Sequence, residues 1–300
     1  MSNLWHALQK VITASIARSS AMPALLSPEQ GIAFSYLELA QKAKGLSIGL
    51  QERGVGPGSI VATDLPNVAE GILLHLACAR LGAAVATAKD AAKFHQLPSI
   101  ACAVLASNDS WLSQMSFLAP SIGQSELQSM MTCPLTASSI DNSVNDDTID
   151  RPHGYFGSVS PLMHSAALKQ GQDMIQYLSI IPNDRVCVSI TLYHAFGIGS
   201  ACSAALQAGA TIVLPGVGGI HGCGVPSQRA ELTLHTLESQ KCTLLFCDTP
   251  TLKAMDDVLK QETDLSALRG GVCKTGSGTD ILDENVELKG VKLATLGKRS

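Results

Sequence analysis

Short apolar segments alternate with longer segments of helical periodicity along most of this chain, and the alternation limits the folds open to it. Residues 59–65 form a β-branched run, and residues 68–82 carry apolar side chains at helical spacing. Apolar runs follow at 83–88 and at 100–107. A strand–helix–strand order favours parallel pairing, because the helix returns the chain to the edge where the first strand began. We therefore expect an α/β fold with doubly wound, mostly parallel sheets and flanking helices.

The alternation weakens in a polar interval and then returns. Residues 107–151 are rich in serine, asparagine and aspartate, and we interpret them as connecting structure with an exposed loop at 137–151. Helical and strand segments follow one another again from residue 164 onward. We therefore expect a first βα half at 1–136 and a second βα half at 152–300.

Two helix starts carry separate signals. Ser35 is followed three residues later by Glu38, the pattern of a capping box, so a helix is expected to begin there. Residues 4–19 are amphipathic and basic and contain serines but no acid, which is typical of a mitochondrial presequence. The alternative is that they form the first helix of the folded domain. Both interpretations stay open, because one helix can serve both purposes.

Composition excludes several classes of protein. Hydrophobic residues make up 46% of the chain and charged residues 15%, which indicates a folded globular protein. The net charge of -4 gives no electrostatic reason to expect nucleic acid as a partner. No apolar run reaches the roughly 20 residues needed to span a bilayer. The nine cysteines are scattered without a CxxC pair, which favours buried, reduced thiols.

Five stretches resemble the AMP-forming acyl-CoA synthetases, a family of adenylate-forming enzymes, in their order and spacing. The last of them, LRGGVCKTGS, is most similar to the medium-chain, mitochondrial-type branch of the family. The resemblance implies that the chain folds like part of the family's large N-terminal domain and lacks the small C-terminal domain. The five stretches are residues 34–67, 79–85, 192–214, 242–252 and 268–277, and the helix after His164 matches the family as well, between the second stretch and the third.

The family's phosphate loop is similar to YTSGTTGxPKGVxxTH, and Tyr155–His164 matches only its two ends. A phosphate-binding loop needs glycines, N–H donors, hydroxyls and a nearby cation. Gly157, Ser158 and Ser160 are present in the segment. However, Pro161 has no N–H, and no lysine lies between the two ends. The resemblance therefore implies a phosphate loop that has lost its glycine-rich, lysine-bearing middle.

Two further motifs imply a remnant of the family's ligand pocket. In YHAFG, the residues His194, Phe196 and Gly197 resemble the histidine-bearing strand end beside the carboxylate site. Gly276 and Ser277 resemble the turn that lines the adenine site. Structural roles are the alternative for both motifs. His194 would then bond to the backbone with Phe196 in the core, and the glycines would shape a strand-to-helix turn.

The C-terminal residues depart from the family in a further respect. The family continues to a motif similar to YGxTE, whose threonine and acid help to hold nucleotide and magnesium. Leu296 and Gly297 stand where tyrosine and glycine would be, followed by Lys298, Arg299 and Ser300. A magnesium site needs oxygen ligands, and two cations would repel the ion. The family's later ribose-binding aspartate, hinge and catalytic lysine have no counterpart in these 300 residues.

These departures lead us to expect a catalytically inactive homologue, with no catalytic residue and no metal site. It would act as a structural or interaction subunit of a larger, mitochondrial assembly, or else of a cytoplasmic one. Other proteins would bind the surface that the missing half domain leaves exposed. One alternative is a module that binds an acyl group or an adenine nucleotide. Another is an acyl-CoA ligase; only an active ligase would need ATP, magnesium and CoA.

Overall fold

The computed structural model describes seven stretches of the chain, and they belong to two units. The first unit comprises Met1–Ser19, Phe34–Pro66 and Glu70–Lys169, and the second comprises Ser20–Ala33, Asn67–Ala69 and Gln170–Ser300. Most of the predicted loop at 137–151 lies outside the described residues. The described stretches are residues 2–18, 22–87, 100–104, 121–132, 149–157, 160–216 and 225–298.

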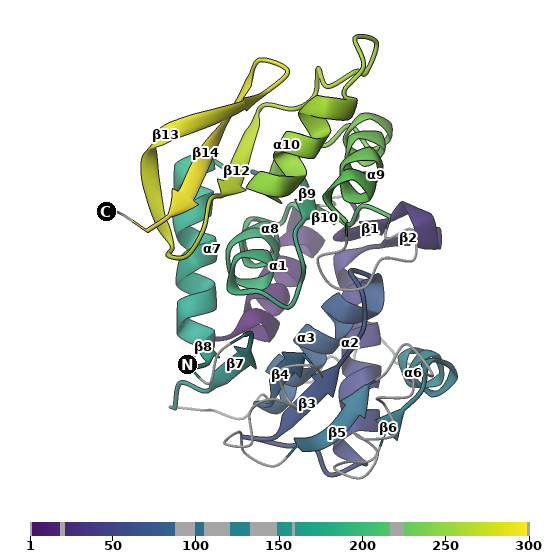
Figure 1. The fold of residues 1–300 in the computed structure, drawn as a ribbon. Helices are drawn as coiled ribbons and strands as arrows, with labels where there is room; N and C mark the ends of the chain where they lie inside the picture. The colour runs from purple at the N-terminus through teal and green to yellow at the C-terminus, as the bar shows by residue number, and fades with distance from the viewer. Residues whose placement is uncertain are drawn as a thin grey trace. The chain divides into compact units, whose positions relative to one another are not determined.

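The first unit is built on a six-stranded sheet in the order β6-β5-β3-β4-β7-β8 (Figure 1). Its first five strands are parallel, and β8 is antiparallel to β7. All four residues of β3 are buried, as expected for a parallel strand covered on both faces. The strands are β3 (Ile60–Thr63), β4 (Ala84–Thr87), β5 (Ile100–Val104), β6 (Ser121–Ile122), β7 (Pro152–Tyr155) and β8 (Leu162–Met163).

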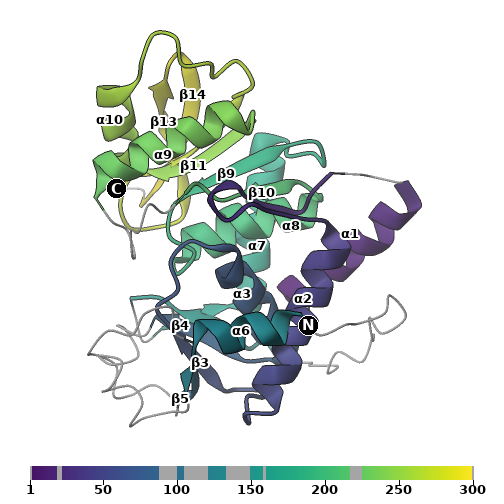
Figure 2. The ribbon, with the colours of Figure 1, turned by 90° about the vertical axis from the view of Figure 1, so that its right-hand side faces the viewer.

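The first unit contains helices α1 (Leu4–Arg18), α2 (Tyr36–Gln51) and α6 (Gln124–Met131), and most of α3 (Ala69–Leu81) (Figure 2). The capping box is confirmed, because Ser35 Oγ accepts from the Glu38 N–H at 3.2 Å and the Glu38 carboxylate accepts from the Ser35 N–H at 2.8 Å.

Helix α1 is packed into the first unit. Leu4, Trp5 and Leu8 are fully buried, and the Asn3 amide donates to the carbonyl of Ala79 at 2.8 Å. The residues that suggested a presequence therefore also supply part of this unit's core.

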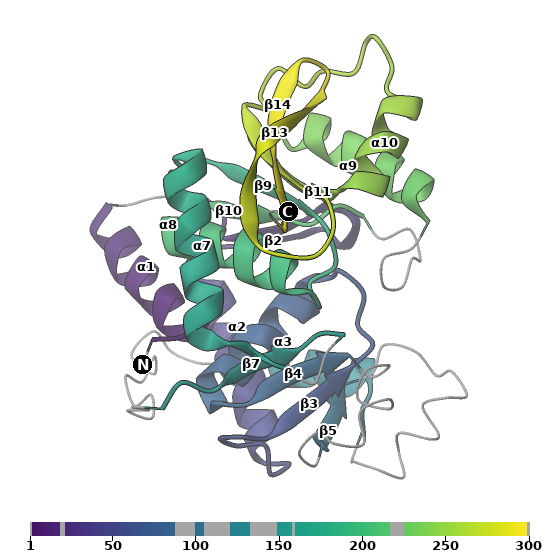
Figure 3. The ribbon, with the colours of Figure 1, turned by 60° about the vertical axis from the view of Figure 1, so that its left-hand side comes forward.

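The second unit is built on an eight-stranded sheet in the order β13-β14-β12-β11-β9-β10-β1-β2 (Figure 3). The strands from β14 to β1 run parallel, and β13 is antiparallel to β14. The strands are β1 (Leu25–Ser27), β2 (Ile32–Phe34), β9 (Arg185–Ser189), β10 (Thr211–Val213), β11 (Leu244–Asp248), β12 (Gly270–Lys274), β13 (Asp280–Leu288) and β14 (Val291–Gly297).

Helices α9 (Pro226–Ser239) and α10 (Thr249–Val258) lie side by side in the second unit (Figure 2). Leu234, Leu252 and Met255 pack there with buried residues of β9, β11 and β12 in one hydrophobic cluster. The remaining helical elements are η1 (Pro28–Gln30), the π-helix η3 (Ala195–Cys202), α8 (Ser203–Ala208) and α7 (His164–Leu178), which begins in the first unit.

The predicted α/β class and mostly parallel sheets are confirmed. The polar interval was predicted only as connecting structure, and this was wrong at β6 and α6. Helix α6 was missed because it is polar, with only Leu127 and Met131 of its described side chains buried. The six described free cysteines are all buried, as the sequence indicated. No described helix has the length and apolar character to cross a membrane.

Candidate functional site

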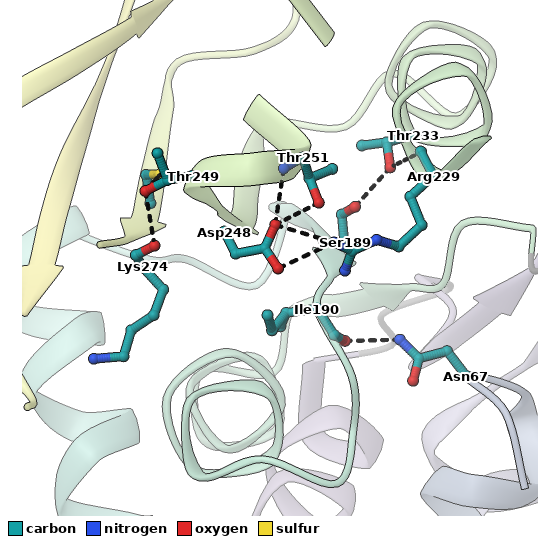
Figure 4. A network of polar contacts seen from close by, with 10 residues as sticks. Asn67, Ser189, Ile190, Arg229, Thr233, Asp248, Thr249, Thr251 and Lys274 are labelled. Carbon is teal, nitrogen blue, oxygen red and sulfur yellow. Dashed lines mark hydrogen bonds and ion pairs between the residues drawn. The ribbon is translucent and has the colours of Figure 1, made fainter. Parts of the chain in front are cut away.

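Polar side chains gather in the second unit where β9, β11 and β12 reach their carboxyl ends (Figure 4). Ligands of parallel α/β sheets bind outside this edge, because the loops that follow the strands converge there. The described residues with this placement include Ser189, Asp248 and Lys274, which end the three strands. We call this region the second-unit edge.

His194 follows β9 and caps the π-helix η3. Its Nδ1 accepts a hydrogen bond from the Phe196 N–H at 3.1 Å, and its side chain is exposed. Because Nδ1 is the acceptor, a neutral ring carries its proton on Nε2. Partial burial lowers the pKa of His194, the Lys274 cation lowers it further, and Asp248 opposes both effects. His194 can therefore offer a neutral Nε2–H donor at neutral pH.

The loop that carries His194 is fixed by Asn67. The Asn67 Nδ2 donates to the carbonyl of Ile190 at 2.7 Å, and its Oδ1 accepts from the Leu192 N–H at 3.0 Å (Figure 4). One amide thus replaces the pairing that these backbone groups lose beyond the strand end. The sequence did not indicate this role, since Asn67 lies more than a hundred residues away.

Asp248 ends β11 and caps α10. Its Oδ1 accepts from the Thr251 N–H at 2.9 Å and also from the Thr251 hydroxyl. Its Oδ2 pairs with the Arg229 guanidinium at 3.0 Å, and both side chains are largely buried. The signal was present in the sequence, because an aspartate before Thr-Pro is a typical helix start. Asp248 is therefore already neutralised by Arg229 rather than by Lys274.

Lys274 ends β12 and begins the turn that contains Gly276 and Ser277. Its Nζ donates to the carbonyl of Gly278, and partial burial lowers its pKa. Gly276 and Ser277 are both exposed, and Gly276 has open space around the position of a Cβ atom. With a φ of 139°, Gly276 adopts a conformation that other residues rarely reach.

Phe196 and Gly197 lie in the core of the second unit. Phe196 is 2% exposed, and its ring centroid lies 5.7 Å from that of Phe246. A Cβ on Gly197 would lie 2.1 Å from the carbonyl oxygen of Thr191, so only glycine fits. Of the five predicted pocket residues, the structure leaves His194, Gly276 and Ser277 exposed.

Two side chains at the second-unit edge are hydrogen-bond donors. A neutral Nε2–H of His194 and the Lys274 ammonium are both donors. Among the described residues, no group of three or more histidine, cysteine or acidic side chains is arranged to hold a metal ion. The arrangement therefore suits a carboxylate or phosphate oxygen better than a cation.

The segment Tyr155–His164 lies in the first unit, at the carboxyl end of β7. Strands β7 and β8 form a short antiparallel pair with Gly154 opposite Leu162, and α7 begins directly afterwards at His164. The His164 N–H donates to the carbonyl of Arg151 at 3.0 Å, and the His164 side chain is 4% exposed. Ser158 lies outside the described residues, as do Arg299 and Ser300 at the C-terminus. Leu296 and Gly297 are buried, and Lys298 is exposed.

Comparisons with known proteins show a similarity in sequence over part of the chain and in fold over most of it. Residues 12–102 match the family model described as AMP-binding enzyme. The putative acyl-CoA synthetase YngI of Bacillus subtilis (strain 168) is 21% identical over 91% of this chain and 57% of its own length. The mitochondrial medium-chain acyl-CoA ligase ACSF2 of Danio rerio is 30% identical over 38% of this chain and 18% of its own length.

Solved structures share the fold of nearly the whole chain. The N-terminal domain of FACL13 from Mycobacterium tuberculosis has a TM-score of 0.74 with 14% identity, over 92% of this chain and 70% of that domain. The chain spans little more than half of the Bacillus relative and less than a fifth of the Danio relative. Residues 12–102 are therefore similar in sequence to the AMP-binding enzymes, and nearly the whole chain has the fold of the FACL13 N-terminal domain.

Proposed function

We propose that this ligase-like domain does not catalyse adenylation by itself and acts as a structural or interaction subunit. The observation that supports this most is the segment Tyr155–His164. Adenylation joins a carboxylate to the α-phosphate of ATP, and catalysis depends on cations and N–H donors around the developing negative charge. The segment has no lysine, and Pro161 removes a further donor.

The geometry of the segment supports the same proposal. A single short connection, residues 156–161, joins two strands that pair with each other. The His164 side chain is buried, at 4% exposure. Each missing charge-stabilising group typically lowers a rate by about 10²–10³. Because the lysine and its glycine-rich loop are both lost, we do not expect useful turnover by this chain.

Pyrophosphate release tests this proposal. The purified chain is mixed with ATP, magnesium and a panel of carboxylic acids from acetate to palmitate, with and without CoA. We expect no release above the rate without protein. Release that disappears in a His194→Gln variant would overturn the proposal and identify an active ligase.

The interaction role rests on a separate observation. Tyr177 and Ile181, at the end of α7 and just beyond it, are 48% and 52% exposed. Exposed apolar side chains so close together favour contact with another protein. The basic, acid-free first helix and the mitochondrial relative from Danio rerio support a mitochondrial location for that assembly.

Affinity capture from mitochondrial extract should retain a partner of fixed stoichiometry, and Tyr177→Ser should release it. A monomer without a partner would contradict the role.

A second candidate function is supported by the second-unit edge. There, His194 and Lys274 place two donors beside the exposed turn at Gly276 and Ser277. Asp248 is already paired with Arg229. It would therefore compete little with an added anion for the Lys274 ammonium. We propose that such a module binds the carboxylate of an acyl compound or the phosphate of an adenine nucleotide.

Calorimetry with octanoate, AMP and octanoyl-CoA separates the two candidates. Binding by the edge predicts that Lys274→Gln weakens affinity at least about tenfold, because a charge-assisted hydrogen bond contributes about 1.5–3 kcal/mol. Lys253→Gln is the matched control, since Lys253 is exposed on α10 of the same unit. No heat from any of the three compounds at millimolar concentration would leave only the subunit proposal.

A further inference from the structure

Three histidines from different elements of the first unit lie in ring contact. His75 belongs to α3, His153 to β7, and His164 begins α7. The ring centroids of His75 and His153 are 5.1 Å apart and the rings are stacked, while those of His153 and His164 are 4.9 Å apart and edge-on. The ring of Phe156 lies edge-on to His75 at 6.0 Å. We call the three residues the histidine cluster.

The cluster is arranged for neutral rings. His75 and His153 are fully buried and His164 is 4% exposed. Neither ring nitrogen of His153 has a hydrogen-bond partner. Burial holds the pKa of His153 well below its usual range, and the neighbouring His164 and His75 lower it further. His164 also stands at the N-terminus of α7, where the helix dipole disfavours a positive charge.

Within the part of the chain that the structure describes, no carboxylate acts on the charge of His153. The groups that act on the charge of His153 are His164 and His75. Asp150 and Arg151 line a small cavity with His164, but Asp150 accepts from the Ser165 N–H at 3.1 Å. Other titratable groups on the packed elements are engaged or turned elsewhere. Glu70 accepts a hydrogen bond from Gln128. Arg80 donates to Ser47, and its guanidinium lies over the ring of Trp5. Burial raises the pKa of the Tyr155 phenol, and Lys169 is exposed.

A metal ion is not the occupant that this geometry suggests. No group of three or more potential ligands among the described residues is arranged to hold one. Three adjacent imidazoles can still take up protons. Burial and the repulsion between protonated rings both disfavour this uptake. A protonated His153 ring would need water, and because His153 is fully buried, water would reach it if one of the three elements moved away.

We propose that the histidine cluster is a proton-sensitive latch that holds the β7–β8 hairpin against the first unit. The hairpin is the element that can leave, because β7 pairs with β4 over only two residues, Gly154 and Tyr155. It carries His153 and leads directly into His164. Opening it would expose Tyr155 and His164, the two buried ends of the phosphate-loop segment, whatever that segment does. The proposal therefore does not rest on the proposed function.

The direction of the pH effect follows from linkage. In the open hairpin a histidine has an ordinary pKa of about 6.5, whereas in the closed hairpin His153 stays neutral far below that value. Above about pH 6.5 both forms are neutral and the equilibrium does not change. Below it the open form gains a proton and the closed form does not. From pH 7.5 to 5.5 the opening constant should rise about tenfold for His153, and by more if a second ring of the cluster also gains a proton on opening.

Amide hydrogen exchange of the whole chain tests the latch. Exchange is followed by mass spectrometry at pH 7.5 and 5.5 and corrected for the intrinsic pH dependence of amide exchange. We expect the opening constant of residues 152–155 and 162–166 to rise at least about tenfold at pH 5.5. Amides of α2 should show no such rise and serve as the internal reference. Equal opening constants at the two pH values would overturn the latch.

Variants decide whether the cluster causes the effect. His153→Phe keeps an aromatic ring and removes one titrating group, so the pH-dependent rise should shrink about tenfold. His235→Phe is the control, because His235 is exposed on α9 of the second unit. If His153→Phe fails to fold, His75→Phe tests the same point from α3. A full rise retained in the folded variant would contradict the proposal.

Discussion

The two sheets use histidine in opposite ways, the first at the edge where its parallel strands begin and the second at the edge where they end. In the first unit, His153 and His164 are buried in ring contact, with no counter-charge supplied to His153. In the second unit, His194 is exposed, held at Nδ1 by a backbone N–H and influenced by both a lysine and an aspartate. The side chain alone therefore does not determine the chemistry. Burial makes the first pair a structural element, and a single hydrogen bond makes His194 an oriented donor.

Gly197→Ala should break the second-unit edge with the largest effect. The new Cβ would lie 2.1 Å from the Thr191 carbonyl, so the backbone that places His194 must shift. Overpacking of this kind costs about 3 kcal/mol of unfolding free energy. Urea denaturation measures it. Gly56→Ala, with open space and an ordinary φ, is the control and should change stability by less than about 0.5 kcal/mol.

Replacing histidine by glutamine at the two edges tests the comparison directly. His153→Gln buries an amide without the partners it needs and should destabilise the protein by about 2 kcal/mol. His194→Gln keeps a polar group at an exposed position and should cost less than about 0.5 kcal/mol. Thermal unfolding at pH 7.5 reports both values. Equal losses would mean that the two histidines do not differ as described.

Asp248→Ala should have a smaller effect confined to the second-unit edge. It removes the cap of α10 and leaves Arg229 without its carboxylate, at a cost of about 1.5 kcal/mol. Asp248→Asn keeps an acceptor for the Thr251 N–H and should recover about half of the loss. If both variants are equally destabilised, the ion pair rather than the cap dominates at this position.

The parallel cores of both units could be predicted because their signals are local. Runs such as β9 and β11 are continuous, apolar and bounded by helical segments. This pattern is typical of a strand that is covered on both faces. The hairpin β13–β14 was not predicted. Asp280, Asp283 and Glu284 lie exposed on an edge strand and give no alternation. Its turn has Lys289 and Gly290 at positive φ, as a type I′ turn requires, and of the two only the glycine is typical of such a turn.

The candidate site could be predicted only where a short motif carried it. His194 was found from the letters around it, and its exposure fits a site residue. The roles of Asn67 and Arg229 were not predicted, because their partners lie on other elements and no local sequence pattern indicates these contacts. The histidine cluster was missed for the same reason. His75, His153 and His164 are brought together only by the packing of three elements.

The pairing of β1 with β10 has a consequence for synthesis of the chain. Leu25 stands opposite Ile212 in the parallel register, so β1 is made long before its neighbour in the sheet exists. Until residue 213 has left the ribosome, the apolar β1 strand has no native partner along β10. Pairings so distant in sequence form slowly and leave strand edges exposed in the meantime. We therefore expect this protein to depend on chaperones during translation more than a chain of its length with local pairings would.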